Sequence, residues 1–331
     1  MGRDGITARR FSLLFFAFAV SLFAAVFFGS TRTNITEAIA AILRGDHTSA
    51  AYRILVYVRL PRVVAAILAG SALAAAGAII QAVLHNPMAA PNIIGVNSGA
   101  GLAVSIVVGI LPAAVWAIPA AAFLGALAAC LLIYAVAART GAGRLTITLV
   151  GVAVSSIFSA GINSIKTIFP DSLYNTSTFL IGGFSGVSYA KLAPAAVLIA
   201  AGLAAACICA RHIDILSMGE ETAQSLGMNV GLFRFVLLVL ASVLAGSAVS
   251  FAGLLGFVGL LVPHMSRRII GANHTRLIPF CAMGGAVLVL ICDLLGRILF
   301  APYELPVGII LSFVGGPFFI AQILMQRKKH D

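Results

Sequence analysis

The sequence predicts an all-α polytopic membrane protein with about ten transmembrane helices, in which one helical unit occurs twice in inverted orientation. Of its 331 residues 61% are hydrophobic and only 9% are charged, whereas soluble domains carry roughly a quarter charged residues. No Asp, Glu, Lys or Arg occurs between Arg62 and Arg139, a run long enough for three spans of about 20 residues each. The phrase LAGSALAAAG at 68–77 returns as LAGSAVSFAG at 244–253. These three observations carry the prediction.

Hydropathy and turn residues place the candidate spans along the chain. Spans near 20 residues are about twice as long as a barrel strand and lack its alternation, so only helices fit. The first apolar run is longer than a signal-peptide core, and we interpret it as a retained span. The seventh and eighth spans abut without a polar loop, so one of them is expected to be short or broken. The spans lie roughly at 11–29, 63–83, 93–110, 114–137, 146–168, 192–210, 231–250, 251–266, 278–298 and 306–326.

The net charge of +11 bears on orientation. Cytoplasmic loops of membrane proteins favour Lys and Arg. With the N-terminus inside, thirteen of these cations fall on the inner side and eight on the outer side, which favours cytoplasmic N- and C-termini. The charge is therefore attributed to the lipid bilayer, and no nucleic-acid partner is expected.

The repeated phrase lies in the second and seventh spans. Five crossings separate its copies, so the second copy runs through the bilayer in the opposite direction. At the same offset Pro87 returns as Pro263, and IIGVN (93–97) returns as IIGAN (269–273). Inverted repeats underlie many alternating-access transporters, with the pathway between the halves. We therefore expect one permease domain over 1–331, with repeat halves at about 61–168 and 231–326.

The source of energy is constrained by what the spans contain. An ion-coupled carrier normally keeps an ionisable group inside the membrane, and the only carboxylate in the proposed spans is Asp293. It precedes Arg297 by four residues, so the two can pair on one helix face. A structural ion pair and a coupling-ion site are both open for Asp293. The chain has no Walker A sequence, because none of its four lysines follows a glycine, so an ATPase would be a separate subunit.

The longest inner loop, 211–230, carries a candidate docking helix. Residues from Ser217 to Leu226 are compatible with a helix, and Gly219 and Gly227 can punctuate it. Met218, Thr222 and Leu226 are spaced at i, i+4 and i+8, which gives an apolar edge for another protein.

Other chemistry is weakly supported. The five cysteines include no Cys-x-x-Cys pair, so neither a zinc site nor a disulfide framework is indicated, and we expect no metal site. No paired His, Cys or carboxylate constellation has catalytic spacing. The chain is therefore not expected to be an enzyme.

Four stretches resemble the FecCD-type permeases of ABC importers, which carry ferric siderophores, haem, cobalamin and related chelates. They cover most of the chain from Arg59 onward in family order. They are RLPRVVAAILAGSALAAAGAIIQAVLHNPMAAPNIIGVNSGAG (59–101), MGEETAQSLGM (218–228), GFVGLLVPHMSRRIIGANHTRLIP (256–279) and DLLGRILFAPYELPVGIILSFVGGPFFI (293–320).

The resemblance implies a cobalamin-permease-like homodimer in the bacterial cytoplasmic membrane, with two ABC ATPase subunits and an extracytoplasmic substrate-binding protein. ATP and Mg would be used by the ATPase, and this chain would bind no cofactor. The 217–227 segment would be the coupling element that seats on the ATPase. Its residues are Ser217, Met218, Gly219, Glu220, Glu221, Thr222, Ala223, Leu226 and Gly227.

The resemblance also implies two further sites. Arg59 and Arg62 of RLPR and Arg297 of DLLGR match outer arginines that meet acidic residues of the binding protein. Snorkelling at a helix end is the alternative for each. The inner gate would lie between spans four and five. There this chain has Ala142 and Gly143 where the cobalamin permease carries small hydroxyl residues.

The expected function is passage of a ferric siderophore or similar iron chelate to the cytoplasm by alternating access. Haem, cobalamin or an oxyanion in the same type of importer stays open, because no residue discriminates among them. An ion-coupled secondary transporter that uses Asp293 is the alternative from another class.

Overall fold

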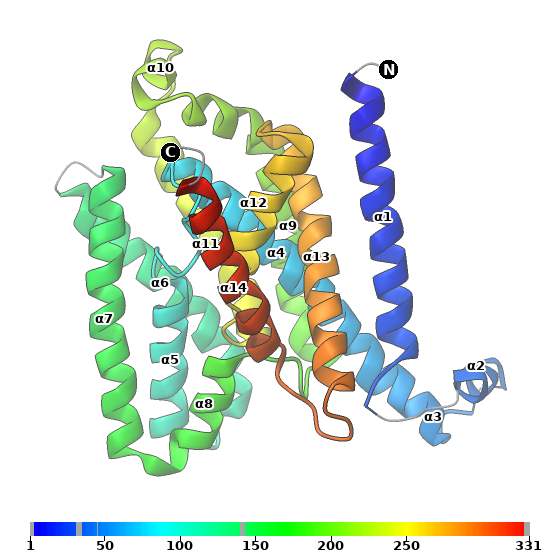
Figure 1. Ribbon diagram of the computed structural model, residues 1–331. Helices are drawn as coiled ribbons and strands as arrows, with labels where there is room; N and C mark the ends of the chain where they lie inside the picture. Colours follow the sequence, from blue (N-terminus) through cyan, green and yellow to red (C-terminus); the bar gives the residue numbers. More distant parts are fainter. Residues whose placement is uncertain (1–2, 31–34, 45, 140–142, 328–331) are drawn as a thin grey trace.

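A computed structural model describes residues 3–30, 35–44, 46–139 and 143–327 (Figure 1). Within these ranges the chain is all-helical, with no strand. The helices are α1 (Arg3–Phe27), α2 (Ile35–Arg44), α3 (Ala50–Arg53), η1 (Ile54–Arg59), α4 (Leu60–Val83), α5 (Val96–Ile110), η2 (Val115–Ala117), α6 (Ile118–Ala138), α7 (Arg144–Ile168), η3 (Pro170–Ser172), α8 (Leu173–Ile181), α9 (Tyr189–Ser217), α10 (Glu220–Ser225), α11 (Val230–Ala252), α12 (Val258–Ile270), α13 (His274–Ile298) and α14 (Val307–Arg327).

Each of the ten predicted spans overlaps a helix of the structure. Seven helical stretches in the described part of the chain are long and apolar enough to cross a membrane, and α5 and residues 307–321 of α14 form shorter apolar helices. The boundary predicted for the eighth span, 251–266, is wrong. Residues 253–257 are not helical, and α12, with only 13 residues, begins at Val258. The expectation that one of the two abutting spans is short or broken is confirmed.

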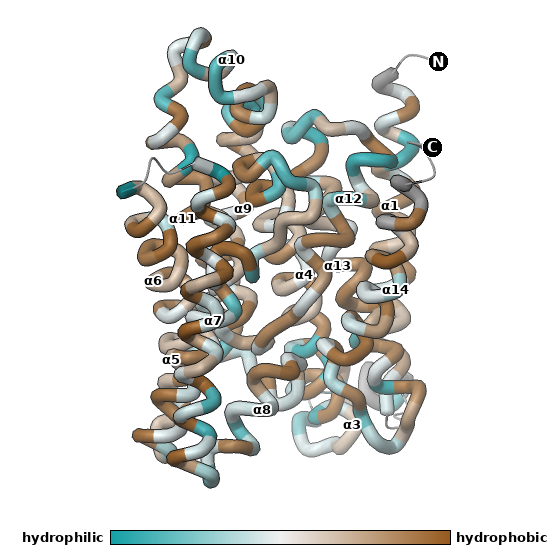
Figure 2. The backbone as a smooth tube through the Cα atoms, turned by 60° about the vertical axis from the view of Figure 1, so that its left-hand side comes forward, coloured by the Kyte–Doolittle hydropathy of each residue, from teal (hydrophilic) through white to brown (hydrophobic). Residues whose placement is uncertain are grey.

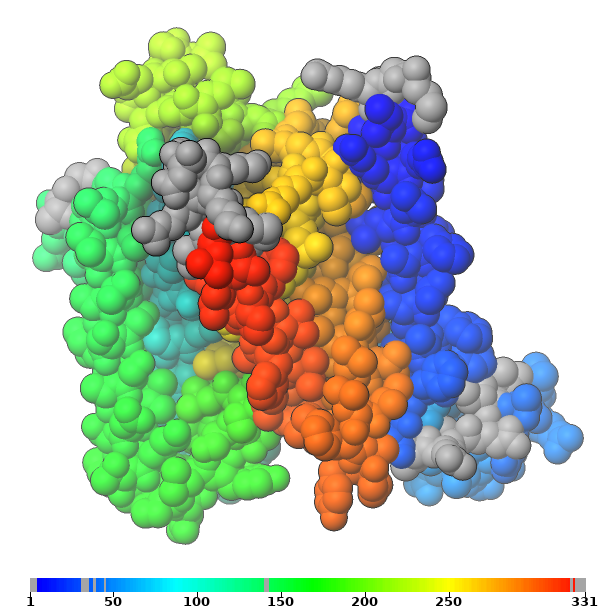
Figure 3. All heavy atoms as spheres, in the orientation of Figure 1, coloured from blue at the N-terminus to red at the C-terminus, as the bar shows by residue number. Residues whose placement is uncertain are grey.

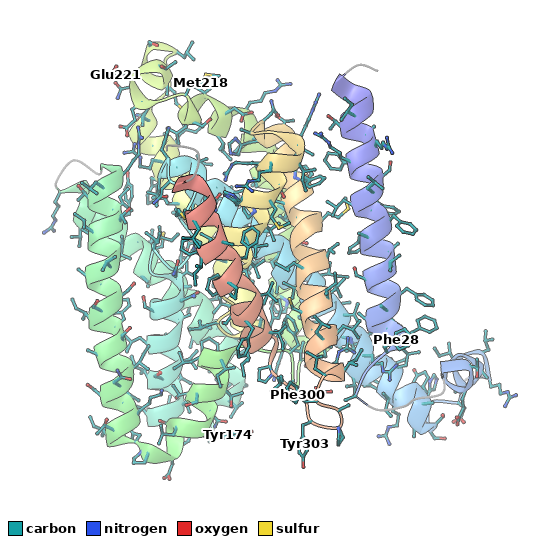
Figure 4. All side chains as sticks on the ribbon, in the orientation of Figure 1. Phe28, Tyr174, Met218, Glu221, Phe300 and Tyr303 are labelled. Carbon is teal, nitrogen blue, oxygen red and sulfur yellow. The ribbon has the colours of Figure 1, made fainter. Side chains whose placement is uncertain are left out.

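The bundle has two distinct ends. The N-terminus, the C-terminus and α10 lie at one end, and α2, α3 and α8 lie at the other (Figure 1). Apolar residues dominate the helix bodies, and hydrophilic stretches gather near the ends (Figure 2). At the α8 end Tyr174 and Tyr303 are each 80% exposed (Figure 4). Exposed aromatic rings at one level are typical of a membrane–water interface.

Helix contacts match between the two halves when α4, α5, α6 and α7 correspond to α11, α12, α13 and α14. In the first half α4 packs against α13 and α12, and in the second half α11 packs against the corresponding helices α6 and α5. Likewise, α5 packs against α7, and α12 packs against α14. α4 starts at the α3 end of the bundle, whereas α11 starts at the α10 end, so the two helices run in opposite directions (Figure 1). The fold thus contains the inverted repeat.

The repeated phrase, at 68–77 and 244–253, occupies equivalent places in the two halves. Gly70 of α4 lies against Gly285 of α13, and Gly246 of α11 lies against Ala126 of α6. A Cβ on Gly70 would be 2.2 Å from the Gly285 carbonyl oxygen, so only glycine permits this approach of two helix backbones.

The other two sequence matches, Pro87 with Pro263 and IIGVN with IIGAN, do not lie at equivalent places in the two halves. The alignment of the halves inferred from these two matches is therefore wrong. Pro87 lies in the connection between α4 and α5, whereas Pro263 lies inside α12. IIGVN leads into α5, whereas IIGAN ends α12. The register is lost because α11 ends at Ala252, within the phrase, while α4 continues to Val83 beyond it.

The core is centred on α4, the most buried of the long apolar helices, with α11 and α13 beside it. Along α4 alanines such as Ala65, Ala69 and Ala72 are fully buried, which allows neighbouring helices to approach closely. α1 and α7 flank the bundle on opposite sides (Figure 3), and little of either helix is buried. α7 therefore has a side that no other helix of the described chain covers.

Candidate functional site

The segment between α9 and α11 carries the predicted coupling residues. Gly219 (φ 115°) and Gly227 (φ 80°) bracket the six-residue helix α10, and such positive φ values favour glycine. The prediction that these two glycines bound a helix is confirmed, but the predicted extent of that helix, Ser217 to Leu226, is wrong. Ser217 closes α9, and the chain turns at Gly219 before α10 begins at Glu220.

The residues of this segment divide between an outer and an inner face. Met218 is 66% exposed and Leu226 is 63% exposed, and Glu221 and Thr222 are exposed as well. Ala223 is fully buried and holds α10 against the bundle. Met218 and Glu221 lie at the extreme α10 end of the molecule (Figure 4). The apolar edge is therefore accessible, although the turn at Gly219 separates Met218 from α10.

Glu220 differs from its neighbours because it faces the bundle. Its Oε1 atom lies 2.8 Å from Nε of Arg144 in α7 and 2.7 Å from Nη2 of Arg234 in α11. Partial burial disfavours the charged carboxylate, but the hydrogen bond from Arg144 and the charges of both arginines outweigh it and lower the pKa of Glu220 below its ordinary value. Glu220 is therefore ionised at neutral pH and joins three helices.

The predicted inner gate is only partly visible. Gly143 precedes α7 as its N-cap, with φ −63° and ψ 155°, and a Cβ added there would lie 3.8 Å from Oγ1 of Thr146, an ordinary van der Waals contact. Ala142 lies outside the described residues. The gate assignment stays a prediction, and the nearest charged group in the chain is Arg144.

The three outer arginines do not lie on the surface. Arg59, Arg62 and Arg297 are only 5%, 7% and 3% exposed. Arg59 Nη1 donates to the carbonyl oxygens of Val26 and Phe27, each at 3.0 Å. Arg297 donates to those of Ala25 and Phe28 at 3.1 Å.

These bonds satisfy the last carbonyls of α1, which have no partner within the helix, and place cations at its negative end. The guanidinium groups of all three arginines are therefore buried within the chain, and their predicted contact with a binding protein stays a prediction. In this structure Arg59 and Arg297 cap α1.

Asp293 of α13 lies between two arginines. It pairs with Arg297 one turn later, at 3.1 Å, as its spacing predicts. It also accepts hydrogen bonds from Arg62 Nε at 2.9 and 3.1 Å, and Arg62 further contacts Glu304. Asp293 is 2% exposed. A carboxylate held by two arginines is poorly suited to exchange a coupling ion, so the geometry favours the structural ion pair over the carrier site.

An open pocket of about 810 Å³ lies along α7 and was not singled out from the sequence. None of its lining residues is charged, and hydroxyl and amide side chains recur among them. Ser155, Ser156, Ser159 and Asn163 come from α7, where Ser156, Ser159 and Asn163 are exposed. The full lining consists of Asn92, Ile93, Asn97, Ser98, Gly151, Val152, Ser155, Ser156, Ser159, Ala160, Ile162, Asn163, Leu180 and Leu254.

The pocket forms where both helical repeats are interrupted. Asn92 and Asn97 flank the start of α5, and Leu254 belongs to the break before α12. A neighbouring pocket of about 280 Å³ shares Asn92 and Asn97 and reaches Phe257 and Phe319. Interrupted helices at matching places in two inverted halves are typical of transport sites. Among the described residues no group of three or more His, Cys, Asp or Glu could hold a metal ion.

Comparisons with known proteins agree with this arrangement. Residues 16–326 match the FecCD transport family. The chain is 37% identical over 272 residues to the Fe(3+)-citrate import system permease protein YfmE of Bacillus subtilis, with 82% of each chain covered. It is 37% identical over 290 residues to the hemin transport system permease protein HmuU of Yersinia pestis, with 85% of this chain and 86% of the relative covered.

The fold is also found among solved structures. It superposes with a TM-score of 0.85 on a metal-chelate type ABC transporter in an inward-facing conformation, at 24% identity and with 96% of this chain and 99% of the other covered. The family match spans nearly the whole chain, and two relatives exceed one third identity over most of their length. The chain therefore belongs to the FecCD transport family.

Proposed function

We propose that this chain is the membrane-spanning permease subunit of an ATP-driven ABC importer in the bacterial cytoplasmic membrane. It would pass a ferric siderophore or similar iron chelate inward by alternating access. The observation that carries the proposal is the uncharged polar pocket along α7. Hydroxyl and amide groups can form hydrogen bonds with a passing chelate, and they carry no fixed charge that would bind it too tightly for release. Relatives named for Fe(3+)-citrate, hemin and siderophore transport support this cargo class.

The position of the pocket supports a second permease chain. Ser156, Ser159 and Asn163 are exposed on a helix long and apolar enough to span the membrane. Polar groups facing lipid are costly, whereas groups facing a water-filled cavity are not. A second copy of this chain packed against α7 would close the open side of this pocket. Bacillus subtilis has two permeases named for the same Fe(3+)-citrate system, so a related second permease is the other pairing to test.

The ATPase would dock at the α10 end. Met218 and Leu226 supply exposed apolar surface there, and Glu221 and Thr222 supply polar contacts. An exposed Met and Leu at the tip of a membrane protein are expected to be covered by a soluble partner. The predicted coupling residues available for this contact are therefore Glu221 and Thr222 on α10, with Met218 and Leu226 beside it.

The binding protein would dock at the opposite end. Arg59, Arg62 and Arg297 are buried there, so we propose that they shape the docking surface by fixing the ends of α1, α4 and α13. Exposed cations at the same end, Arg44 and Arg53, are available for direct contact with acidic groups. Replacing Arg53 with Glu should then weaken docking, whereas changes at Arg59 should act through stability.

Reconstituted vesicles test the proposal. The permease is assembled alone, with its ATPase, and with the ATPase and a loaded binding protein outside. Uptake of labelled ferric siderophore only in the complete system, with ATP inside, is the expected result. Concentration of cargo by the permease alone would overturn the proposal. Uptake of hemin or cobalamin in place of the siderophore would reassign the cargo within the same type of importer, and co-purification of differently tagged copies decides the pairing.

A further inference from the structure

We propose that Glu220 is a positioning residue that transmits movement of the coupling helix to α7 through its ion pair with Arg144. This inference rests on the proposed function, because it presumes that an ATPase acts on α10. It concerns a residue whose side chain turns away from the partner surface and into the permease.

The first observation is the position of the acceptor. Glu220 starts α10, immediately after the turn at Gly219. One oxygen, Oε1, contacts guanidinium nitrogens from two other helices at 2.8 and 2.7 Å. Bonds of this length between charged groups are among the strong ones in proteins. A displacement of α10 must therefore either carry both arginines with it or break these contacts.

The second observation is the position of the donors. Arg144 is the first residue of α7, where the helix dipole disfavours a cation, so its own helix gives it no counter-charge. Arg234 is 3% exposed within α11, and a buried cation needs a counter-charge. Glu220 supplies negative charge to both sites. The same carboxylate thus stabilises the inner ends of α7 and α11.

The third observation is how the helices pack. α10 packs against α9 and α11, whereas α7 packs against α5 and α6. The Glu220–Arg144 pair is therefore a direct connection between the coupling segment and α7, whose other contacts lie elsewhere. α7 lines the polar pocket with Ser155 and Ser159. Movement passed to its first residue would shift the wall of the pocket and the adjoining predicted gate.

The consequence is a division of work between two neighbouring carboxylates. Glu221 is exposed at the tip and faces the partner, whereas Glu220 is the internal connection. Loss of Glu220 should leave docking of the ATPase intact but weaken its mechanical connection to the pathway. A residue needed only for folding would not separate these two properties.

The test measures transport and hydrolysis in the same vesicles, with the complete transporter. The variants are Glu220→Gln, Arg144→Gln, their combination and Arg144→Lys. For each single Gln variant we expect ATPase co-purification and hydrolysis as in the wild type, with cargo moved per ATP reduced about tenfold, the factor that corresponds to about 1.4 kcal/mol. The combined variant should be no worse than the single ones, because both remove the same contact. Arg144→Lys should keep most of the wild-type ratio of cargo moved per ATP hydrolysed, because lysine retains the positive charge.

The controls separate this inference from folding and from the proposed function. Glu37→Gln removes an exposed carboxylate at the far end of the bundle and should change nothing. Wild-type uptake without ATP dependence would contradict the proposed function itself. Wild-type coupling in Glu220→Gln and Arg144→Gln would overturn only the inference. Glu220→Gln also removes the counter-charge of buried Arg234, so some loss of thermal stability is expected there and not in Arg144→Gln. Additive losses in the combined variant, or loss of ATPase binding in either single Gln variant, would likewise overturn the inference in favour of a structural role.

Discussion

Replacement of Gly70 by Ala tests whether direct backbone contact holds the two halves of the repeat together. A Cβ at this position would lie 2.2 Å from the carbonyl oxygen and 2.5 Å from the carbonyl carbon of Gly285, and 2.8 Å from the nitrogen of Ala286. All three atoms belong to the backbone of α13, so no side-chain rotation can relieve the clash. α4 and α13 would have to separate along the most buried part of the bundle.

The expected magnitude combines two opposing effects. Gly to Ala within a helix gains about 0.5–1 kcal/mol from backbone entropy. Overpacking a core typically costs about 1–3 kcal/mol, and rigid backbone neighbours favour the upper part of that range. The net loss should be about 1–2 kcal/mol. For domains of 150–250 residues each kcal/mol shifts Tm by about 2–4 °C, and the shift decreases with chain length. At about 2 °C per kcal/mol for this longer chain, a decrease of about 2–4 °C is expected.

The chain offers two matched controls. A Cβ on Gly246, the counterpart of Gly70 in the second copy, would lie 3.1 Å from Cβ of Ala126 and 3.5 Å from Cδ2 of Phe123. A shift of α6 by a few tenths of an ångström relieves the 3.1 Å contact, and the 3.5 Å contact is ordinary van der Waals contact, so the gain in helix propensity should roughly cancel the cost. A Cβ on Gly316 of α14 would meet nothing within 4 Å. Gly316→Ala should therefore leave Tm unchanged or raise it slightly.

Thermal unfolding in detergent can be followed by the reaction of buried thiols with a fluorescent maleimide. Cys130, Cys281 and Cys292 are buried and become reactive only when the helices separate. Tm is expected to be highest for Gly316→Ala, lower for Gly246→Ala and lowest for Gly70→Ala. An unchanged Tm for Gly70→Ala, or an equal decrease for Gly246→Ala, would refute the claim that this backbone approach constrains the fold.

Three further predictions concern the ends and the pocket. Asp293→Asn leaves two buried arginines without their shared counter-charge, so thermal unfolding should report a loss of about 3–5 kcal/mol; a stable variant would show that the cluster is hydrated. Changing Met218 and Leu226 together to Ser removes the exposed apolar edge, and pull-down should show weaker ATPase association with unchanged Tm, while wild-type association would contradict the docking assignment. Ser159→Leu places a bulky apolar group in the pocket and should lower uptake several-fold without affecting ATPase association; normal uptake would remove α7 from the pathway.

The sequence predicted the helices well where each span is continuous. It misplaced α12 because the break at 253–257 is itself apolar, so hydropathy gives no sign of it. The backbone groups freed there are satisfied by distant partners. Leu254 N donates to the Phe179 oxygen, and Gly183 N donates to the Ala252 oxygen. These bonds join the end of α11 to the end of α8, and no local pattern encodes them.

The arginine cluster illustrates the same limit at a charged site. The Asp293–Arg297 pair could be predicted, because four residues are one helical turn. The Arg62–Asp293 contact joins residues 231 positions apart, and the caps on α1 depend on where that helix ends in space. Charge and position near a membrane boundary suggested display to a partner. Burial was decided by the tertiary packing of α1 against α13, which a single sequence does not specify.

The pocket differs, because its signal is present in the sequence. Ser155, Ser159 and Asn163 are spaced at i, i+4 and i+8 on one face of α7, whose central part, 149–165, is otherwise apolar except for Ser156 and Ser164. In a soluble protein such a face would only meet water. Within a bilayer it is costly unless it borders a polar cavity or another chain. The stripe therefore bears on the assembly as well as on the fold, and it supports the proposed partner chain across α7.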